Sequence, residues 1–239
     1  MVWILTGTGA TTIPLNFDAN DKILVEYYAN HPELKAKYAH SGQYVLQISM
    51  KFYQEPGTRY SISSDPFGPI AEHEWPTACK TELTSKRFGT LKSLLDMSGF
   101  GEKLIVDAAL QDIIEQLDPG IHQFRPVRIT TKHDEDFPGQ YFYMRIGRFI
   151  DSFSPEHSNP EYFRGEFDSI NKHQQYFSSF SGRSPSSSLA FSRTAFHGAH
   201  LWREKCLRIP NVFVSDELRN AIKAAGLKTP TLYKATEVA

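Results

Sequence analysis

The sequence has little cysteine, no long apolar run and almost no net charge, and each shortage excludes a class of protein. The two cysteines, Cys79 and Cys206, are too few among 239 residues for a disulfide-stabilised scaffold. With 26 basic and 27 acidic residues the net charge is −1, so charge gives no reason to expect nucleic acid or an anionic membrane as partner. No stretch approaches the roughly 20 apolar residues of a membrane helix, and the opening residues lack a signal-peptide core. These shortages predict a soluble cytoplasmic protein.

Catalytic and cofactor motifs are also missing. The run Gly7-Thr8-Gly9 starts like a dinucleotide fingerprint, but Ile13-Pro14 stands where the helix should begin, so we interpret it as a turn after an edge strand. No serine lies in a GxSxG elbow, and the acidic cluster at residues 134–136 is typical of a solvated turn. Three residues of metal-ligand type lack zinc-site spacing: His197, His200 and Cys206. The sequence therefore predicts no catalytic residue, no metal ligand and no cofactor.

What the sequence does contain is a segment that nearly occurs twice. Residues 104–118, LIVDAALQDIIEQLD, and residues 212–226, VFVSDELRNAIKAAG, share one design at an offset of 108 positions. Each begins with a short β-branched or aromatic run, continues with an Asp or Ser, and then carries apolar residues at i, i+3, i+4 and i+7. We predict that each segment forms a buried strand that runs into an amphipathic helix. The expected helix-capping residues are Asp107, Ser215 and Asp216.

The rest of the chain is mostly extended, and residues 154–188 are expected to be irregular because they end in SSFSGRSPSSS. Other expected elements are a helix at Pro32–Tyr38 and strands at Tyr44–Met50, Gln123–Thr130 and Gln140–Asp151. Few, short helices without βαβ alternation predict an α+β fold, mostly antiparallel sheet, with the two similar strand–helix units in the C-terminal two-thirds. We expect a strand-rich region over residues 1–85, which either folds independently or packs on the rest as one domain, and an α+β domain over residues 86–239.

Three sequence phrases, which follow one another along the chain, together resemble the immunity-protein-eleven family, formerly a domain of unknown function. They are DAALQDIIEQLDPGIHQFRPVRI, which starts at Asp107, GAHLWR at Gly198 to Arg203, and NVFVSDELRNAIKAAGL at Asn211 to Leu227. The family pattern H-x-F-x-P-V matches His122, Phe124, Pro126 and Val127; H-L-[WF]-R matches His200 to Arg203; and V-S-D-x-L matches Val214 to Leu218. The resemblance covers residues 86–236.

The resemblance implies a binding protein rather than an enzyme. Members of the family are encoded beside bacterial polymorphic toxins, in systems of interbacterial competition such as type VI secretion. Such a protein neutralises its cognate toxin by protein–protein contact, and the toxins paired with this family are often nucleases. The implied partner is therefore a toxin encoded next to this chain, in the cytoplasm, with no nucleic acid, membrane or cofactor bound; the oligomeric state stays open.

An acidic and aromatic stretch supplies the first candidates for toxin contact. Residues 156–168 interleave four carboxylates with aromatic side chains, and carboxylates placed where a nuclease binds phosphates would speed association. The HLWR phrase supplies two more, although Trp202 is expected in the core. The partner-binding candidates are Glu156, Glu161, Tyr162, Glu166, Asp168, His200 and Arg203.

Two alternatives stay open. An enzyme that acts on a small molecule could use histidines as acid and base in a pocket between the two regions, the candidates being His122, His197 and His200. A regulatory or scaffold module without a toxin would carry the same sequence features, and the neighbouring gene would distinguish it.

Overall fold

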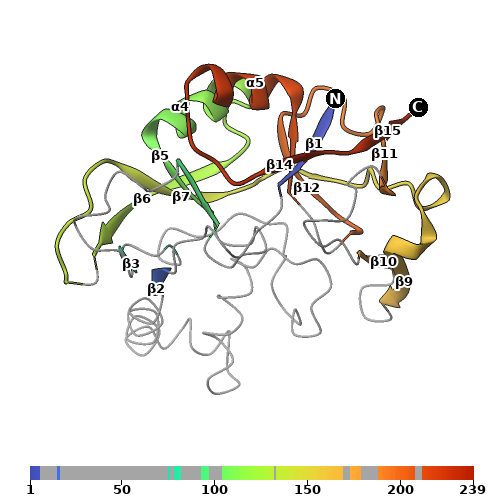
Figure 1. Ribbon diagram of the computed structural model, residues 1–239, viewed down its shortest axis with the longest axis horizontal. Coiled ribbons are helices and arrows are strands. Elements are labelled where there is room, and N and C mark those ends of the chain that lie inside the picture. Colours follow the sequence, from blue (N-terminus) through green and yellow to red (C-terminus); the bar gives the residue numbers. More distant parts are fainter. Residues whose placement is uncertain are drawn as a thin grey trace, which may run out of the picture.

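The computed structural model describes residues 1–5, 15–16, 75, 78–81, 93–96, 104–131, 133–168, 173–178, 188–207 and 212–239. The helix expected at Pro32–Tyr38 and the strand expected at Tyr44–Met50 lie outside these residues. In Figure 1 the α-helices lie above the two larger sheets of the described residues, and the two-stranded sheets lie toward one end of the molecule.

The first strand–helix unit follows its sequence pattern. Strand β5 (Leu104–Asp107) has three buried apolar residues and runs directly into helix α4 (Ala108–Leu117). The Asp107 carboxylate accepts a hydrogen bond from the Leu110 N–H at 2.9 Å. It thereby satisfies an amide that has no carbonyl partner within the first helical turn.

The second unit repeats this arrangement with one difference at the cap. Strand β13 (Val212–Ser215) runs into helix α5 (Asp216–Ala224), and the Ser215 hydroxyl accepts from the Leu218 N–H at 3.1 Å. Asp216 is the first residue of the helix rather than its cap. Its carboxylate therefore lies at the positive end of the helix dipole.

Each unit places its strand inside a larger sheet. Strand β13 belongs to a five-stranded sheet of order β14-β1-β13-β12-β8, and β5 belongs to a six-stranded sheet of order β2-β3-β6-β7-β5-β4. The other strands of the first sheet are β1 (Val2–Leu5), β8 (Phe149–Ile150), β12 (Leu201–Glu204) and β14 (Leu232–Lys234). Those of the second are β2 (Leu15–Asn16), β3 (Ala78–Thr81), β4 (Leu94–Asp96), β6 (Gln123–Thr130) and β7 (Tyr141–Arg145). Neighbours are antiparallel except for the parallel pairs β3–β6 and β8–β12.

The two sheets share a four-stranded pattern that is circularly permuted. In one, β4 lies on one side of β5, and β7 and then β6 lie on the other. In the other, β12 lies on one side of β13, and β1 and then β14 lie on the other. Strands β6 and β14 each follow their helix in the chain, so β1 takes the place of β7 although it comes from residues 2–5. All these neighbours are antiparallel, and the internal repeat is therefore larger than a strand and a helix.

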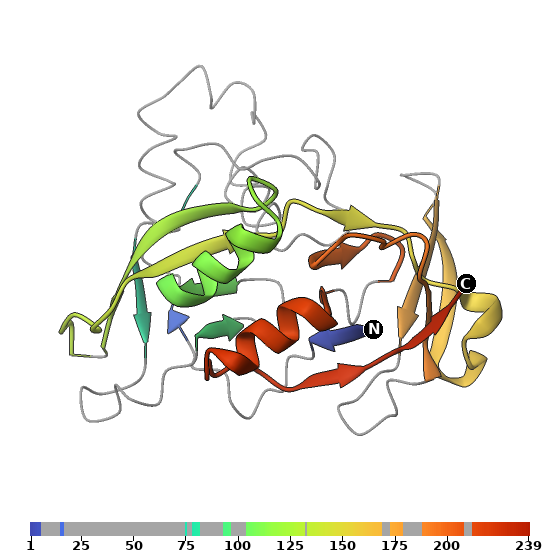
Figure 2. The ribbon, with the colours of Figure 1, turned by 90° about the horizontal axis from the view of Figure 1, so that it is seen from above.

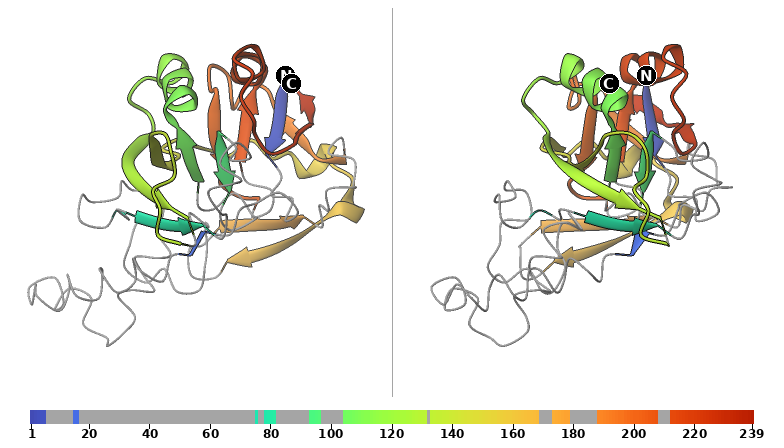
Figure 3. Two further views of the ribbon diagram at one scale, coloured as in Figure 1. Left: turned by 60° about the vertical axis from the view of Figure 1, so that its left-hand side comes forward. Right: turned by 90° about the vertical axis from the view of Figure 1, so that its left-hand side faces the viewer.

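Helices α4 and α5 lie against each other over one face of both sheets (Figures 2 and 3), and one apolar core joins the units. Matching positions of the two units contribute to it: Leu104, Val106, Leu110 and Ile114 from the first, and Val212, Val214, Leu218 and Ile222 from the second. Burial of each such side chain contributes about 1.5–3 kcal/mol. Each unit thus buries its apolar stripe against the other.

The opposite face of the five-stranded sheet carries an aromatic core. Trp202 is fully buried and stacks between Phe196 and Phe213, at centroid distances of 5.2 and 5.8 Å. The expectation that Trp202 belongs to the core is confirmed.

The prediction of an irregular segment over residues 154–188 is wrong for residues 154–168 and 173–178, while residues 169–172 and 179–187 lie outside the described part of the chain. Two short 3-10 helices, η3 (Pro155–His157) and η4 (Pro160–Tyr162), lead into a hairpin of β9 (Phe163–Asp168) and β10 (His173–Ser178). Aromatic burial orders this region, because rings of the hairpin pack on Phe153 in the aromatic core. The rings of Phe163 and Tyr176 lie 5.2 and 5.1 Å from that of Phe153.

The strand predicted over Gln140–Asp151 is interrupted, because the chain passes from one sheet to the other between β7 and β8. Gly147 lies at this crossing, and a Cβ atom there would overlap the Ile121 carbonyl. The edge position expected for the opening strand is also wrong, since the buried strand β1 lies between β13 and β14. A short apolar run does not reveal how many neighbours it will pair with.

The predicted fold class is confirmed as α+β, with mostly antiparallel sheets. A last small sheet pairs β11 (Ala190–Ser192) with β15 (Thr236–Val238) in parallel. In the part of the chain that the structure describes, neither α4 nor α5 has the length and apolar character of a membrane-crossing helix.

Candidate functional site

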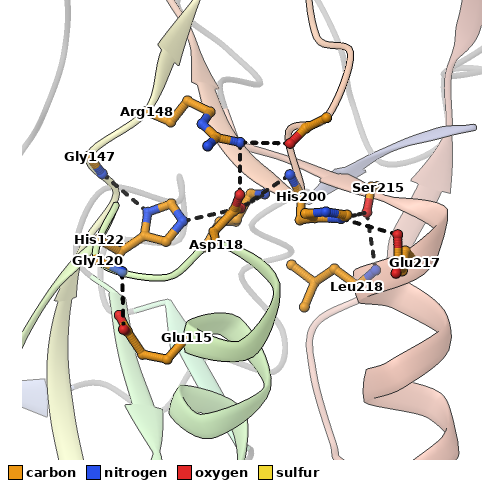
Figure 4. Close-up of polar contacts among 12 residues, drawn as sticks. Glu115, Asp118, Gly120, His122, Gly147, Arg148, His200, Ser215, Glu217 and Leu218 are labelled. Carbon is orange, nitrogen blue, oxygen red and sulfur yellow. Dashed lines mark hydrogen bonds and ion pairs between the residues drawn. The ribbon is translucent and has the colours of Figure 1, made fainter.

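Two of the sequence phrases meet at the buried carboxylate of Asp118, at the C-terminal end of α4 (Figure 4). Its Oδ2 atom accepts hydrogen bonds from the backbone N–H groups of His200 at 3.1 Å and Leu201 at 2.9 Å. Its Oδ1 atom accepts from the Arg148 guanidinium at 2.8 Å. We call Asp118, its two side-chain partners Arg148 and His122, and the His200–Leu201 backbone the Asp118 junction.

His122 uses both ring nitrogens inside this junction. Nδ1 accepts from the Gly147 N–H at 3.2 Å, so the proton of the neutral ring lies on Nε2, 3.4 Å from the Asp118 carboxylate. The ring is buried. A general base needs a free nitrogen that a substrate can reach, and neither nitrogen of His122 meets that requirement.

Electrostatics favour the ionised form of Asp118. Burial alone would raise its pKa, but hydrogen bonds from His122 and Leu201 and the charge of Arg148 hold that pKa below its usual range. Arg148 also donates to the Gly198 carbonyl at 3.2 Å. The junction therefore ties the end of α4 to the start of β12 and to the chain crossing at Gly147, which is a structural task.

A second histidine contact looks like a catalytic triad but has the wrong geometry. The Ser215 hydroxyl lies 3.0 Å from His200 Nδ1, and a Glu217 carboxylate oxygen lies 3.7 Å from the same nitrogen. A Ser-His-acid triad requires the nucleophile and the acid on opposite ring nitrogens. The third histidine of the enzymatic alternative, His197, is exposed. The three histidines therefore do not converge on one pocket.

The predicted partner-binding residues divide into exposed and covered groups. The carboxylates of Glu156, Glu161 and Glu166 are exposed along η3, η4 and β9, and we call these three residues the acidic strip. Asp168 ends β9. By contrast, Tyr162 packs partly against the aromatic core.

The two candidates from the HLWR phrase are covered. Arg203 is only 1% exposed, so its side chain is not presented to a partner. The His200 ring is partly buried and directed toward Ser215. Sequence reasoning assigned them to the surface because a strand pattern alone does not distinguish the two covered faces of a sheet from an exposed one.

One surface residue was missed among the contact candidates. Phe167 of β9 is 59% exposed, next to Glu166 in the acidic strip. At the other end of the hairpin, the Arg164 guanidinium lies over the Phe177 ring at 5.3 Å, beside a cavity of about 440 Å³. In the sequence Phe167 is a large apolar residue between Glu166 and Asp168, but only the structure shows that its side chain stays exposed.

A second buried carboxylate, Glu204, lies with Asp151 and Cys206, and ligand-type atoms of the three lie within 4.8 Å of one another. Burial is the largest influence on Glu204 and raises its pKa to about 7, against hydrogen bonds from Ser152. Burial and the charge of Glu204 raise the pKa of the Cys206 thiol well above its ordinary value. Among the described residues, this group brings metal-ligand atom types together, and of the three residues dismissed as zinc ligands from the sequence it contains only Cys206.

Comparison with known protein families gives a match. The model of one family, described as Immunity protein family (Imm11), matches residues 16–237. The match includes all three sequence phrases and extends further toward the N-terminus than the resemblance found over residues 86–236. A search of curated protein sequences finds no match.

Proposed function

The chain belongs to the Imm11 immunity protein family, and we propose that it binds and neutralises a cognate bacterial toxin, a nuclease, by protein–protein contact. The observation that carries the proposed contact is the acidic strip with Phe167 beside it. Strip and ring lie on one continuous stretch from η3 to β9.

The strip suits an electrostatic contact. The Glu156 side chain is 66% exposed, and Glu161 and Glu166 are exposed as well. Exposed carboxylates on one partner steer it toward a basic cleft on the other, and a nuclease has such a cleft because it binds phosphates. The strip would thus occupy the place of the nucleic acid.

Phe167 supplies the apolar component of the contact. Aromatic residues enclosed by polar neighbours dominate the energy of many protein interfaces, because their burial removes a large apolar area from water. Phe167 is held on a paired strand, where it faces Gln174 of β10, so little conformational entropy is lost on binding.

The proposal extends to the cellular setting. The toxin would be encoded next to this chain and used in competition between bacteria, for example after delivery by type VI secretion. A nuclease acts in the cytoplasm, so its inhibitor would be needed there. Inhibition by contact requires no cofactor and no reaction catalysed by this chain.

The test is complex formation with the toxin encoded by the neighbouring gene. The double variant Glu161→Ala/Glu166→Ala should weaken binding about tenfold, mainly by slowing association, with an unchanged melting temperature. Surface plasmon resonance at low salt measures this, and the effect should shrink as salt rises.

A charge-matched control uses exposed carboxylates elsewhere, Asp112 on α4 and Glu135 in the turn after β6. The variant Asp112→Ala/Glu135→Ala should bind as the wild type does. Equal weakening by both double variants would show that overall charge, not the acidic strip, controls association. Absence of any complex between the wild-type proteins would refute the proposed function itself.

A further inference from the structure

A cavity of about 400 Å³ opens beside the acidic strip, between the segment after β8 and strand β10. Asp151 and Pro155 line it from the segment after β8, and Tyr176 lines it from β10. Lys205 and Cys206, which follow β12, also line it.

The cavity has a carboxylate, Asp151, in its wall and a second, Glu204, buried next to it, while Lys205 also contributes to the lining. The Asp151 carboxylate is exposed and accepts from the Cys206 thiol at 3.0 Å. Behind it, Glu204 accepts from the Ser152 hydroxyl at 2.6 Å and from the Ser152 N–H. Among the described residues, no lysine or arginine pairs with either carboxylate. A carboxylate in the wall of a partly enclosed space, with a second carboxylate buried next to it, is stabilised by a cation that enters from outside.

The walls suit a flat organic cation. Tyr176 packs edge-on against Phe153, with ring centroids 5.1 Å apart, and both rings line the cavity. Aromatic surfaces attract a guanidinium through cation–π contact. Glu156 follows Pro155 directly, so the rim of the cavity continues into the acidic strip.

We propose that this cavity binds the side chain of an arginine that the toxin presents, with the guanidinium at Asp151 and against Tyr176. The inference rests on the proposed function and specifies the chemistry of one contact within it. An arginine is the natural occupant because nucleases use basic side chains to hold phosphates.

Size and chemistry favour a side chain over a metal ion. A cavity of about 400 Å³ is much larger than the roughly 30 Å³ that a water molecule occupies in the liquid. A thiol must lose its proton to bind a metal, and burial with the charge of Glu204 makes that loss harder for Cys206. Lys205 places a positive charge at the cavity, so its removal should strengthen the binding of a guest cation.

The first experiment needs no toxin. N-acetyl-arginine amide is titrated into the 15N-labelled protein, with N-acetyl-citrulline amide as a neutral control of the same shape. We expect saturable shifts of the amide resonances of Lys205 and Cys206 in the millimolar range with the arginine probe, and no saturation with citrulline. Asp151→Asn should abolish the effect, and Lys205→Ala should tighten it. Equal binding of both probes, or no saturable shift, would overturn the proposal.

Zinc binding is tested in parallel by calorimetry. Saturable Zn²⁺ binding that is lost in Cys206→Ser would also overturn the proposal, because the group would then be a metal site.

The second experiment uses the toxin and separates the two hypotheses. Asp151→Asn should weaken the complex about tenfold, with Glu135→Gln as the matched control and with an unchanged melting temperature. If the wild type binds and Asp151→Asn binds equally well, the cavity contact is refuted while the immunity function stands. If the wild type does not bind, the function is refuted, and the probe titration alone decides whether the cavity takes arginine.

Discussion

Asp118 and Glu204 are both buried carboxylates, yet their surroundings shift their pKa values in opposite directions. Asp118 has an arginine, a histidine and two backbone amides as partners, and its pKa lies below the ordinary range. Glu204 has a serine and backbone amides but no cation among the described residues, and its pKa is raised to about 7.

The presence or absence of a cation partner distinguishes a carboxylate with a structural role from one that can bind a partner. A carboxylate that its own chain neutralises holds elements together and offers nothing to a partner. A pair of carboxylates that forms no ion pair with a described lysine or arginine, as at Asp151 and Glu204, costs stability, and such pairs cluster at sites that bind something. The Asp118 junction therefore explains the family phrases as architecture, and the cavity is the place to look for recognition.

The largest expected effect is the loss of the Asp118 junction. Asp118→Ala leaves two buried amides without an acceptor and Arg148 without its counter-charge, so the free energy of unfolding should fall by about 3–5 kcal/mol. Urea denaturation measures it. Asp112→Ala, an exposed acid on the same helix, should change stability by less than about 0.5 kcal/mol. A loss below about 1 kcal/mol for Asp118→Ala would show that the junction is not structural.

The second effect is the pH dependence of folding stability that Glu204 causes. The pKa of Glu204 rises from 4.5 to about 7 on folding, so the folded chain holds this proton more tightly. Stability should therefore fall as pH rises from 4.5 through 7, by about 3 kcal/mol in total. Denaturation between pH 4.5 and 8 should show this slope for the wild type and for Glu135→Gln, and a flatter curve for Glu204→Gln. An unchanged slope in Glu204→Gln would mean that Glu204 is ionised in the folded state at pH 5.

The smallest expected effect is the loss of a helix cap. Asp107 only caps its helix, whereas Ser215 caps and also contacts His200. Asp107→Ala should cost about 1 kcal/mol, and Ser215→Ala about 2 kcal/mol because a second hydrogen bond is lost. Thermal denaturation of both variants checks the order. Equal losses would show that the contact with His200 contributes nothing.

Local patterns explain what could be predicted from the sequence. The strand–helix units were predictable because their apolar spacing and caps are properties of neighbouring residues. The bounds of strand β6 were predicted as Gln123–Thr130, the residues that the structure shows. The fold class followed from such elements.

Long-range pairing explains what could not be predicted. Strand β1 pairs with β13, which lies more than 200 positions away in the sequence. Nothing in the run VWIL predicts this pairing. Asp118 reads as a helix stop signal, and its role as an acceptor for His200 and Leu201 depends on contacts across about 80 positions. The β9–β10 hairpin follows from aromatic packing on Phe153, which strand periodicity does not display.

The proposed inhibition, in which this chain covers the active site of a nuclease, can be tested in a cleavage assay. The most direct measurement titrates the purified neighbouring-gene toxin with this protein while nucleic-acid cleavage is followed. The account predicts that cleavage falls linearly to zero at a stoichiometry of one inhibitor per toxin. Undiminished cleavage in the presence of excess protein would contradict it.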